Sequence, residues 1–197
     1  MEPLLRHLPE IAIAAALAWG SGLRVYATLF LVGLAGTLGW LELPPHLRVL
    51  ELPLVLAASA FMMFVEFFAD KLPWVDSMWD IVHTFIRIPA GAALAAAVFG
   101  DSAAGTALAA AIIGGTIAAG AHLSKSGGRA AMNISPEPFS NWAASLAEDA
   151  AVPAGLWLAF AHPAAFLVLL GALVLAAVLL LRAIGRGLAR LVARCGG

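Results

Sequence analysis

Acidic side chains recur at helical spacing in the first half of the chain. Glu66 and Asp70 are four residues apart, and Asp76, Asp80 and His83 follow at intervals of four and three. Residues three or four apart lie on one face of a helix, so each group presents its polar side chains together. Such a face can bind a cation, relay protons or pair with arginine. We expect a functional role for Glu66 and Asp80, which border or enter apolar sequence, and a solvated loop for Asp76.

A second polar group combines a basic stripe with a pair of acids. The basic stripe has spacings of three, four and four, provided that one helix continues through Gly127 and Gly128: His122, Lys125, Arg129 and Asn133. A second stripe follows in an apolar context, with spacings of four and three before its two adjacent acids: Asn141, Ser145, Glu148 and Asp149. A polar stripe among apolar residues faces protein or water and not lipid. We therefore predict that both stripes line an interior site.

Arg24 is the most isolated charge, because it lies in a long apolar run directly after Gly20, Ser21 and Gly22. A bare cation at that depth costs about 2.5 to 3.5 kcal/mol on insertion scales. We expect it to pair with one or more of Glu66, Asp80, Glu148 and Asp149. The candidate interior acids outnumber the bases expected at the same depth. This surplus favours a cation or proton route over the alternative, a purely structural network of ion pairs.

The composition places these residues in a membrane protein. Of 197 residues, 62% are hydrophobic and 12% are charged, and the mean hydropathy is +0.96. Globular chains are roughly 45 to 50% apolar and about 25% charged, so the excess apolar surface must face lipid. We predict an all-α polytopic transmembrane helix bundle that occupies residues 1–197 as a single domain. A net charge of -1 excludes a nucleic-acid partner, and the single cysteine, Cys195, excludes an internal disulfide.

Six apolar runs are the predicted spans: 11–41, 49–69, 81–100, 103–123, 138–161 and 164–182. The first is too long for one straight span, and we expect the glycines at 20 and 22 to break it. The halves 1–100 and 101–182 each contain three runs, a glycine interruption in the first and acids beside a proline in the second. This shared order predicts an inverted repeat with broken or re-entrant helices. The alternative is that the small residues only allow helices to pack closely, which equally permits a homodimer.

The basic residues predict the orientation. With six crossings both termini lie on one side, where nine of the eleven Lys and Arg residues fall, whereas only Arg48 falls on the other. Both termini are therefore predicted to be cytoplasmic. The tail 183–197 continues a series of arginines at every fourth position from Arg182 to Arg194, which is typical of a basic helix that contacts anionic membrane lipids.

Three stretches resemble a bacterial family of small integral membrane proteins of unknown function: SGLR at 21–24, EFFADKLP at 66–73 with the acids at 76 and 80, and the long motif at 122–149. The resemblance implies a common fold with a polar interior, located in the bacterial inner membrane. It names no substrate. Gly127 and Gly128 depart from the pattern, since better helix formers are expected there.

The favoured function is a small secondary transporter or channel-like carrier that moves an ion or small polar solute, coupled to protons or another cation. Its predicted site residues are Arg24, Glu66, Asp70, Asp80, Arg129, Asn133, Asn141, Glu148 and Asp149, with Asp76, His83, His122, Lys125 and Ser145 as secondary candidates. A lipid-phosphate carrier is the first alternative, since a lipid phosphate needs arginine donors near the membrane surface.

An enzyme is a weaker alternative. Asp76 and Asp80 have the spacing of a Mg²⁺ and diphosphate site, but the second half offers Glu148 and Asp149 without that spacing. The chain contains no GxSxG, HExxH or Walker motif. We therefore expect no enzymatic activity and no cofactor. A structural membrane protein is the remaining alternative.

Overall fold

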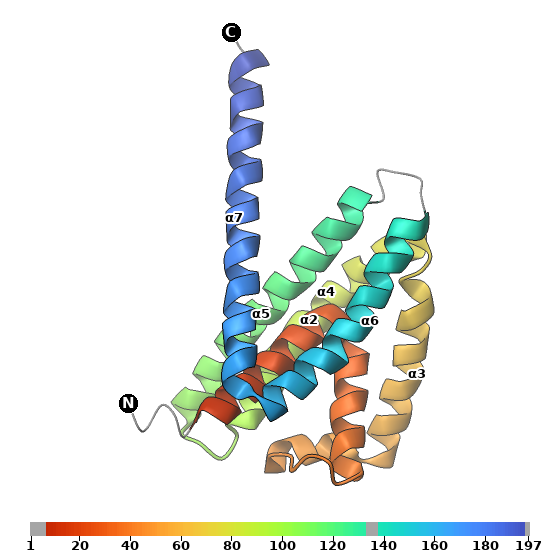
Figure 1. Ribbon diagram of the computed structural model, residues 1–197. Helices are drawn as coiled ribbons and strands as arrows, with labels where there is room; N and C mark the ends of the chain where they lie inside the picture. Colours follow the sequence, from red (N-terminus) through yellow and green to blue (C-terminus); the bar gives the residue numbers. More distant parts are fainter. Residues whose placement is uncertain (1–6, 133–137, 196–197) are drawn as a thin grey trace.

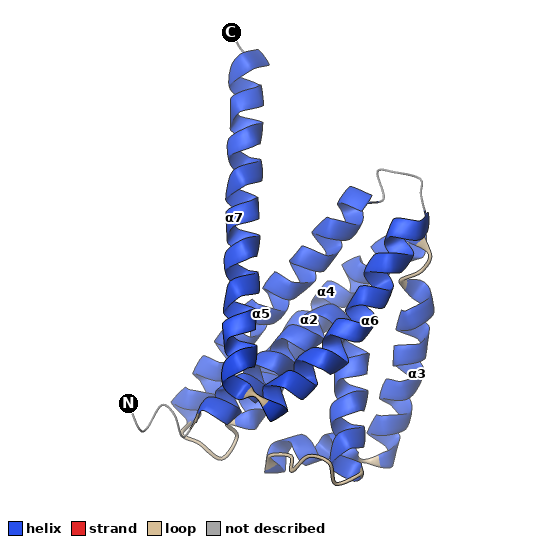
Figure 2. Cartoon of the chain, in the orientation of Figure 1, coloured by secondary structure: helices blue, strands red, loops and turns tan. Residues whose placement is uncertain are grey.

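The computed structural model describes residues 7–132 and 138–195, and every regular element in these ranges is helical (Figure 2). In chain order they are α2 (Leu8–Thr37), the 3-10 helix η1 (Pro45–Glu51), α3 (Pro53–Ala69), α4 (Pro73–Val98), α5 (Ala104–Met132), α6 (Pro138–Ala161) and α7 (Pro163–Cys195). Proline begins five of them, since its missing N–H group has no partner to lose in a first turn. Each of the six predicted runs forms a helix, so the all-α bundle is confirmed.

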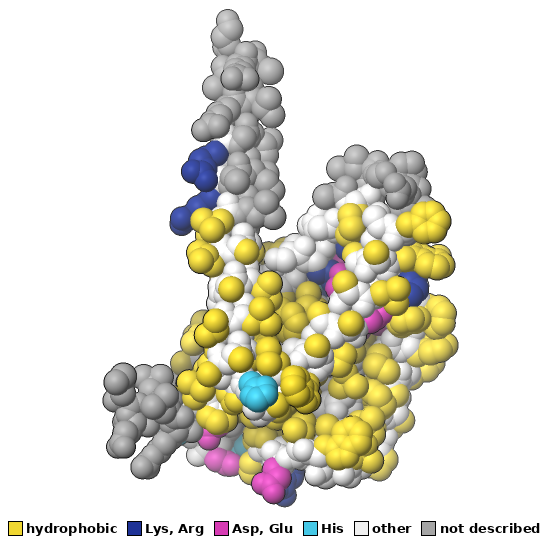
Figure 3. Space-filling model, viewed as in Figure 1, with side chains coloured by type: hydrophobic (Ala, Val, Ile, Leu, Met, Phe, Trp, Pro, Cys, Tyr) yellow, Lys and Arg dark blue, Asp and Glu magenta, His cyan; other side chains and the backbone are white. Residues whose placement is uncertain are grey.

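The helices have the length and surface of membrane segments. Three are long and apolar enough to cross a bilayer, Leu8–Thr37, Met78–Val98 and Ala104–Arg129, and a fourth span results if η1 and α3, bent by 67°, count together. Large side chains such as Phe61, Phe64 and Phe85 are exposed. Hydrophobic side chains accordingly cover much of the described face seen in Figure 3. An exposed apolar surface of this kind is typical of a protein in contact with membrane lipid.

Helix α2 folds back on itself at Arg24. The backbone of Arg24 is non-helical, with φ -144° and ψ 81°. A Cβ built on Gly20 would lie 2.7 Å from Oγ1 of Thr28, although eight residues of straight helix span about 12 Å. Gly22 allows α2 to pack closely on α5 beside the bend, because a Cβ at position 22 would clash with the carbonyl oxygen of Ala118. The predicted break in this run is confirmed, a few residues later than the glycines.

Both ends of α2 therefore lie near the α4–α5 connection. His7 lines a hollow together with Phe99 and Ser102. The other end packs against η1, and His46 of η1 contacts Asp101 at 3.1 Å. Helix α2 is thus a bent hairpin with Arg24 at its tip, although its length alone would suffice for a crossing.

The start of α2 and the end of α7 lie at opposite ends of the molecule (Figure 1). The expectation that both termini share one side of the membrane counts residues 11–41 as a single crossing, and it stays a prediction. The fold-back at Arg24 is the feature of the structure that bears on this count.

The bundle is organised around the first arm of α2, which supplies the alanine-rich core from Ala12 to Ala18. Helix α2 packs on α3, α4, α5 and α6, while α7 packs mainly on α2 and α6 and then extends away from the bundle (Figure 1). The inverted repeat finds no support. Helix α5 continues unbroken through Gly114 and Gly115, whereas α2, its predicted counterpart, folds back. Gly114 serves close packing instead, because a Cβ there would meet the backbone of Gly91 in α4 at 2.9 Å.

Candidate functional site

Eleven charged side chains form one connected set of ion pairs where the tip of the α2 hairpin meets α3, α4, α5 and α6. We call this set the charged network, and its members are the bases Arg24, Lys71, Arg87, Lys125 and Arg129 and the acids Glu66, Asp70, Asp76, Asp80, Glu148 and Asp149. Eight of the eleven are buried, the exceptions being Lys71, Glu148 and Asp149. Few of these charges reach the apolar surface in Figure 3.

Arg24 joins the tip of the hairpin to α3 and α6. Its Nη1 lies 2.9 Å from Oδ2 of Asp70, and its Nη2 lies 3.1 Å from Oδ1 of Asp149. Nη2 also donates to the hydroxyl of Ser145 at 2.9 Å and lies 3.7 Å from Oε2 of Glu148. The expected partners in α6 are therefore present, whereas the expected pairs with Glu66 and Asp80 do not form among the described contacts.

Glu66 and Asp80 pair with Arg87 instead. Nη2 of Arg87 lies 2.7 Å from Oε1 of Glu66, and Nη1 lies 2.7 Å from Oδ1 of Asp80. Arg87 is 0% exposed and lies in the apolar segment Met78–Val98. The count of basic residues in the sequence analysis includes Arg87 on the cytoplasmic side. The spacing of four from His83 and seven from Asp80 is the sequence signal that places Arg87 on the same helix face as these two residues.

The two histidines beside the network have both ring nitrogens in use. Arg87 donates to Nδ1 of His122 at 3.1 Å, so Nδ1 must be unprotonated and the hydrogen lies on Nε2, which is 2.7 Å from Oγ1 of Thr84. His83 lies 2.8 Å from the carbonyl of Trp79 through Nδ1, which leaves Nε2, at 3.1 Å, to accept from the Tyr26 hydroxyl. These contacts fit neutral imidazoles that orient the network, so these two secondary candidates lie beside its ion pairs and carry none of its charges.

Helix α5 contributes the predicted basic stripe to the network. Nζ of Lys125 lies 2.6 Å from Oδ2 of Asp70 and 3.4 Å from Oε2 of Glu148. Arg129 contacts Oε2 of Glu148 at 3.1 Å and donates to Oδ1 of Asn141 at 3.2 Å. The predicted stripe is thus continuous, because α5 runs to Met132 and includes Gly127 and Gly128. Asn133, the last residue of that stripe, lies outside the described residues.

Asp76 is not in a solvated loop, so that expectation is wrong. It lies in the first turn of α4, which begins at Pro73, and it is 0% exposed. Neither of its carboxylate oxygens has a hydrogen-bond partner among the described residues, and Nη1 of Arg129 is 3.7 Å away. Burial raises the pKa of Asp76 to about 7, although the charge of Arg129 lowers it. Burial acts in the same direction on the pKa of Asp70, but Lys125 and Arg24 outweigh it and hold that pKa below its ordinary value.

The network is partly open along one edge. The side chains of Lys71, Glu148 and Asp149 are 16%, 15% and 25% exposed, and Lys71 and Asp149 lie 3.6 Å apart. Nζ of Lys71 also sits 3.0 Å above the ring of Phe67. This edge lies between the α3–α4 connection and α6, and it is the most exposed part of the network.

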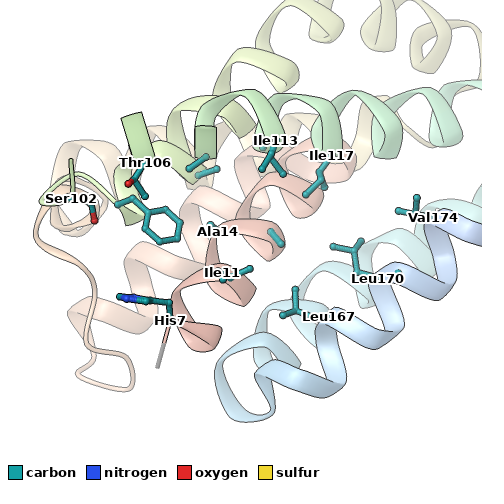
Figure 4. A pocket seen from close by; sticks show the side chains of 16 residues that line it. His7, Ile11, Ala14, Ser102, Thr106, Ile113, Ile117, Leu167, Leu170 and Val174 are labelled. Atoms are coloured by element: carbon teal, nitrogen blue, oxygen red, sulfur yellow. The ribbon is translucent and has the colours of Figure 1, made fainter. Parts of the chain in front are cut away.

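A separate apolar hollow of about 1050 Å³ lies nearer the other end of the bundle (Figure 4). Its walls come from α2, α4, α5 and α7, with Ile11, Phe99, Ile113 and Leu167 among the lining residues. Its lining includes no member of the charged network. Polar groups that converge on a ligand are the mark of a binding site, so the network and not this hollow is the candidate functional site.

The charges of the network do not balance. With all groups ionised and both histidines neutral, the six acids of the network exceed its five bases by one negative charge within the described residues, while its eight buried members are four acids and four bases. In a setting of low dielectric an unbalanced charge is costly, and a group in that position takes up a proton or a counter-ion. The arrangement can therefore hold one proton or one monovalent cation.

Comparison with known proteins identifies the family of the chain. A family model described as "Domain of unknown function (DUF4126)" matches residues 11–183. No protein with a curated description and no solved structure was found to be similar. The matched range contains all eleven members of the charged network. This chain therefore belongs to the family of domains of unknown function DUF4126.

Proposed function

We propose that this protein is a small cation-coupled carrier, either a secondary transporter or a channel-like carrier, whose intramembrane site is the charged network. The observation that carries the proposal is the single excess negative charge of the charged network, whose eight buried members balance and whose excess lies at the partly open edge with Glu148 and Asp149. A purely structural network would gain from equal numbers of acids and bases, because each unpaired buried charge destabilises the fold. A carrier instead needs a charge that alternates between an occupied and an unoccupied state.

The bent hairpin supports this proposal. Broken helices end at the binding sites of many transporters, where the freed backbone groups and helix ends meet the ion or substrate. Here the break falls at Arg24, within the network, and the carbonyl of Leu23 beside it accepts from Nζ of Lys125 at 3.4 Å. A second arm that enters the membrane only to return has no evident role in spanning it, so a role at the site is the better account.

The pairing of the arginines favours a cation over an anionic lipid headgroup. Arg24, Arg87 and Arg129 each contact at least one carboxylate at 3.1 Å or less. A phosphate would have to displace a carboxylate from one of them and would add negative charge to a network that already has an excess. The lipid-phosphate carrier is therefore the weaker candidate, and no catalytic step is proposed.

We also propose a location and an orientation. The protein would lie in the bacterial inner membrane as a multi-pass protein, with the α3–α4 connection and the basic end of α7 in the cytoplasm. Arg182 and Arg186 are exposed there and suit contact with anionic lipids. Because α2 folds back, the N-terminal end would lie on the opposite face, in contrast to the expectation from the sequence. A homodimer stays a prediction.

Isotope exchange in proteoliposomes tests the proposal. Vesicles with purified protein would be assayed for ²²Na⁺ uptake against internal Na⁺, and in parallel for proton movement with an enclosed pH dye. We expect at least one of the two cations to exchange faster than in protein-free vesicles. We expect the Glu148→Gln variant to exchange that cation at least tenfold more slowly than the wild type. Glu42→Gln is the matched control, since Glu42 is exposed and outside the network. Wild-type vesicles that exchange neither cation would refute the carrier.

A further inference from the structure

Three buried aspartates of the charged network converge at the α3–α4 connection. Asp70 directly follows α3, and Asp76 and Asp80 lie in the first two turns of α4. One carboxylate oxygen from each lies within 4.8 Å of the other two. We call these three residues the aspartate triad. Like charges at this distance repel one another, and Lys125 offsets this for Asp70 and Asp80, whereas Asp76 has no basic group nearer than Arg129 at 3.7 Å among the described residues.

The oxygens without partners are an independent sign of a ligand. Within the described residues, Oδ1 of Asp70, Oδ2 of Asp80 and both oxygens of Asp76 are buried and have no hydrogen-bond partner. Asp76 is the most conspicuous, since it is 0% exposed and its nearest ion pair, with Arg129, is 3.7 Å long. Buried carboxylate oxygens in native proteins almost always have a partner, and a bound ion can serve as that partner where no protein group does.

The remaining oxygens of the triad hold the carboxylates in place. Oδ2 of Asp70 lies 2.6 Å from Lys125 and 2.9 Å from Arg24, and Oδ1 of Asp80 lies 2.7 Å from Arg87. Each of these two carboxylates is thus fixed through one oxygen and leaves the other free. Ligands oriented in advance by neighbouring groups bind an ion more tightly, because less order is lost on binding.

Size and charge identify the ion. Oxygen ligands at about 2.4 Å, the distance typical of Ca²⁺, are at most about 4.8 Å apart across the ion, and the three oxygens of the triad lie within that limit. Sodium has nearly the same radius as calcium and half its charge. The network has one excess negative charge, so one monovalent ion neutralises it and a divalent ion would leave it positive. We propose that the aspartate triad binds one sodium ion, which deepens the proposed function and rests on it only for the coupling role of that ion.

Direct binding to the purified full-length chain in detergent tests this assignment. We expect saturable ²²Na⁺ binding with one ion per chain, and a sodium-dependent rise in the unfolding temperature that choline does not reproduce. Asp76→Asn keeps the side-chain shape and removes a charge that has no hydrogen bond to lose, so it should fold and lower sodium affinity at least tenfold. Asp101→Asn is the matched control, because Asp101 is exposed and lies near the other end of α4, and it should bind sodium as the wild type does.

Three results would overturn the assignment: no sodium binding by the wild type, unchanged binding by Asp76→Asn, or displacement of sodium by lower concentrations of Ca²⁺ than of Na⁺. The first and third are measured on the wild type, so they stand even if a variant does not fold. Binding and exchange also separate the two proposals. Sodium binding by the purified protein, without exchange of either sodium or protons in vesicles, would retain the sodium site and refute the carrier. Proton movement in vesicles without sodium binding would retain the carrier and refute the sodium site.

Discussion

Replacing Arg87 by methionine tests whether the charged network stabilises the fold through its internal pairs. The variant removes a guanidinium that is 2.7 Å from both Glu66 and Asp80. At that distance each pair is worth about 6 kcal/mol at an effective dielectric constant near 20, before desolvation is subtracted. Loss of one partner leaves a buried charge uncompensated and typically costs about 3 to 5 kcal/mol. We expect Arg87→Met to lower the free energy of unfolding by that amount.

The double variant with Glu66→Gln separates pairing from packing. Once Glu66 is neutral, loss of Arg87 strands only Asp80, which retains Lys125 at 3.6 Å. The two changes together should therefore cost at least about 2 kcal/mol less than the sum of the single changes. The free energies would be measured by unfolding in mixed micelles of detergent and dodecyl sulfate. The exposed pair His46 and Asp101, with side chains 52% and 70% exposed, is the control and should show a coupling below about 1 kcal/mol. Additive effects at Arg87 and Glu66, within about 0.5 kcal/mol, would refute the reasoning.

Three further predictions concern pH, packing and topology. In sodium-free buffer, the raised pKa of Asp76, about 7 against an ordinary 3.8, stabilises the folded state fully below about pH 4, and this contribution is lost as the pH rises through 7. The unfolding midpoint of the wild type should therefore fall as the pH rises through 7, and that of Asp76→Asn should fall less. An equal fall in both proteins would contradict the raised pKa of Asp76. Gly22→Leu should destabilise by at least about 2 kcal/mol, because its side chain would meet Ala118 and Ala121 of α5, whereas Gly128→Ala, in open space, should not. Reporters fused after residues 45, 102 and 162 should read periplasmic and those after 75, 130 and 197 cytoplasmic, and a reporter at the N-terminus should agree with residue 45.

The sequence predicted the helices well, because long apolar runs bounded by prolines leave few alternatives. It also predicted that Arg24 is paired, since an isolated cation in lipid is too costly to remain alone. The fold-back of α2 was only half predicted. The glycines at 20 and 22 indicated a break, but the direction of the second arm depends on tertiary contacts such as that between Gly20 and Thr28.

Asp76 and Arg87 show where reasoning from local composition fails. Asp76 stands in a polar stretch that is typical of a loop, yet α4 begins at Pro73 and turns the side chain into the bundle. Arg87 was counted with the cytoplasmic basic residues although it lies within the predicted span 81–100, and its spacing from Asp80 already placed it on the acidic face. In both cases periodicity was the better guide, because polar residues in a membrane bundle are buried against one another wherever a helix face allows it.

The position of Arg24 at the tip of the hairpin has a consequence for how this chain is made. One of its partners, Ser145, lies 121 residues later in the sequence. At about 5 to 20 residues per second, the ribosome needs roughly 6 to 24 seconds to complete that interval. During this time the arginine has no α6 partner, and of the carboxylates that it contacts only Asp70 has been made. The polar contacts of the hairpin tip are therefore completed only when α6 has been synthesised and packed.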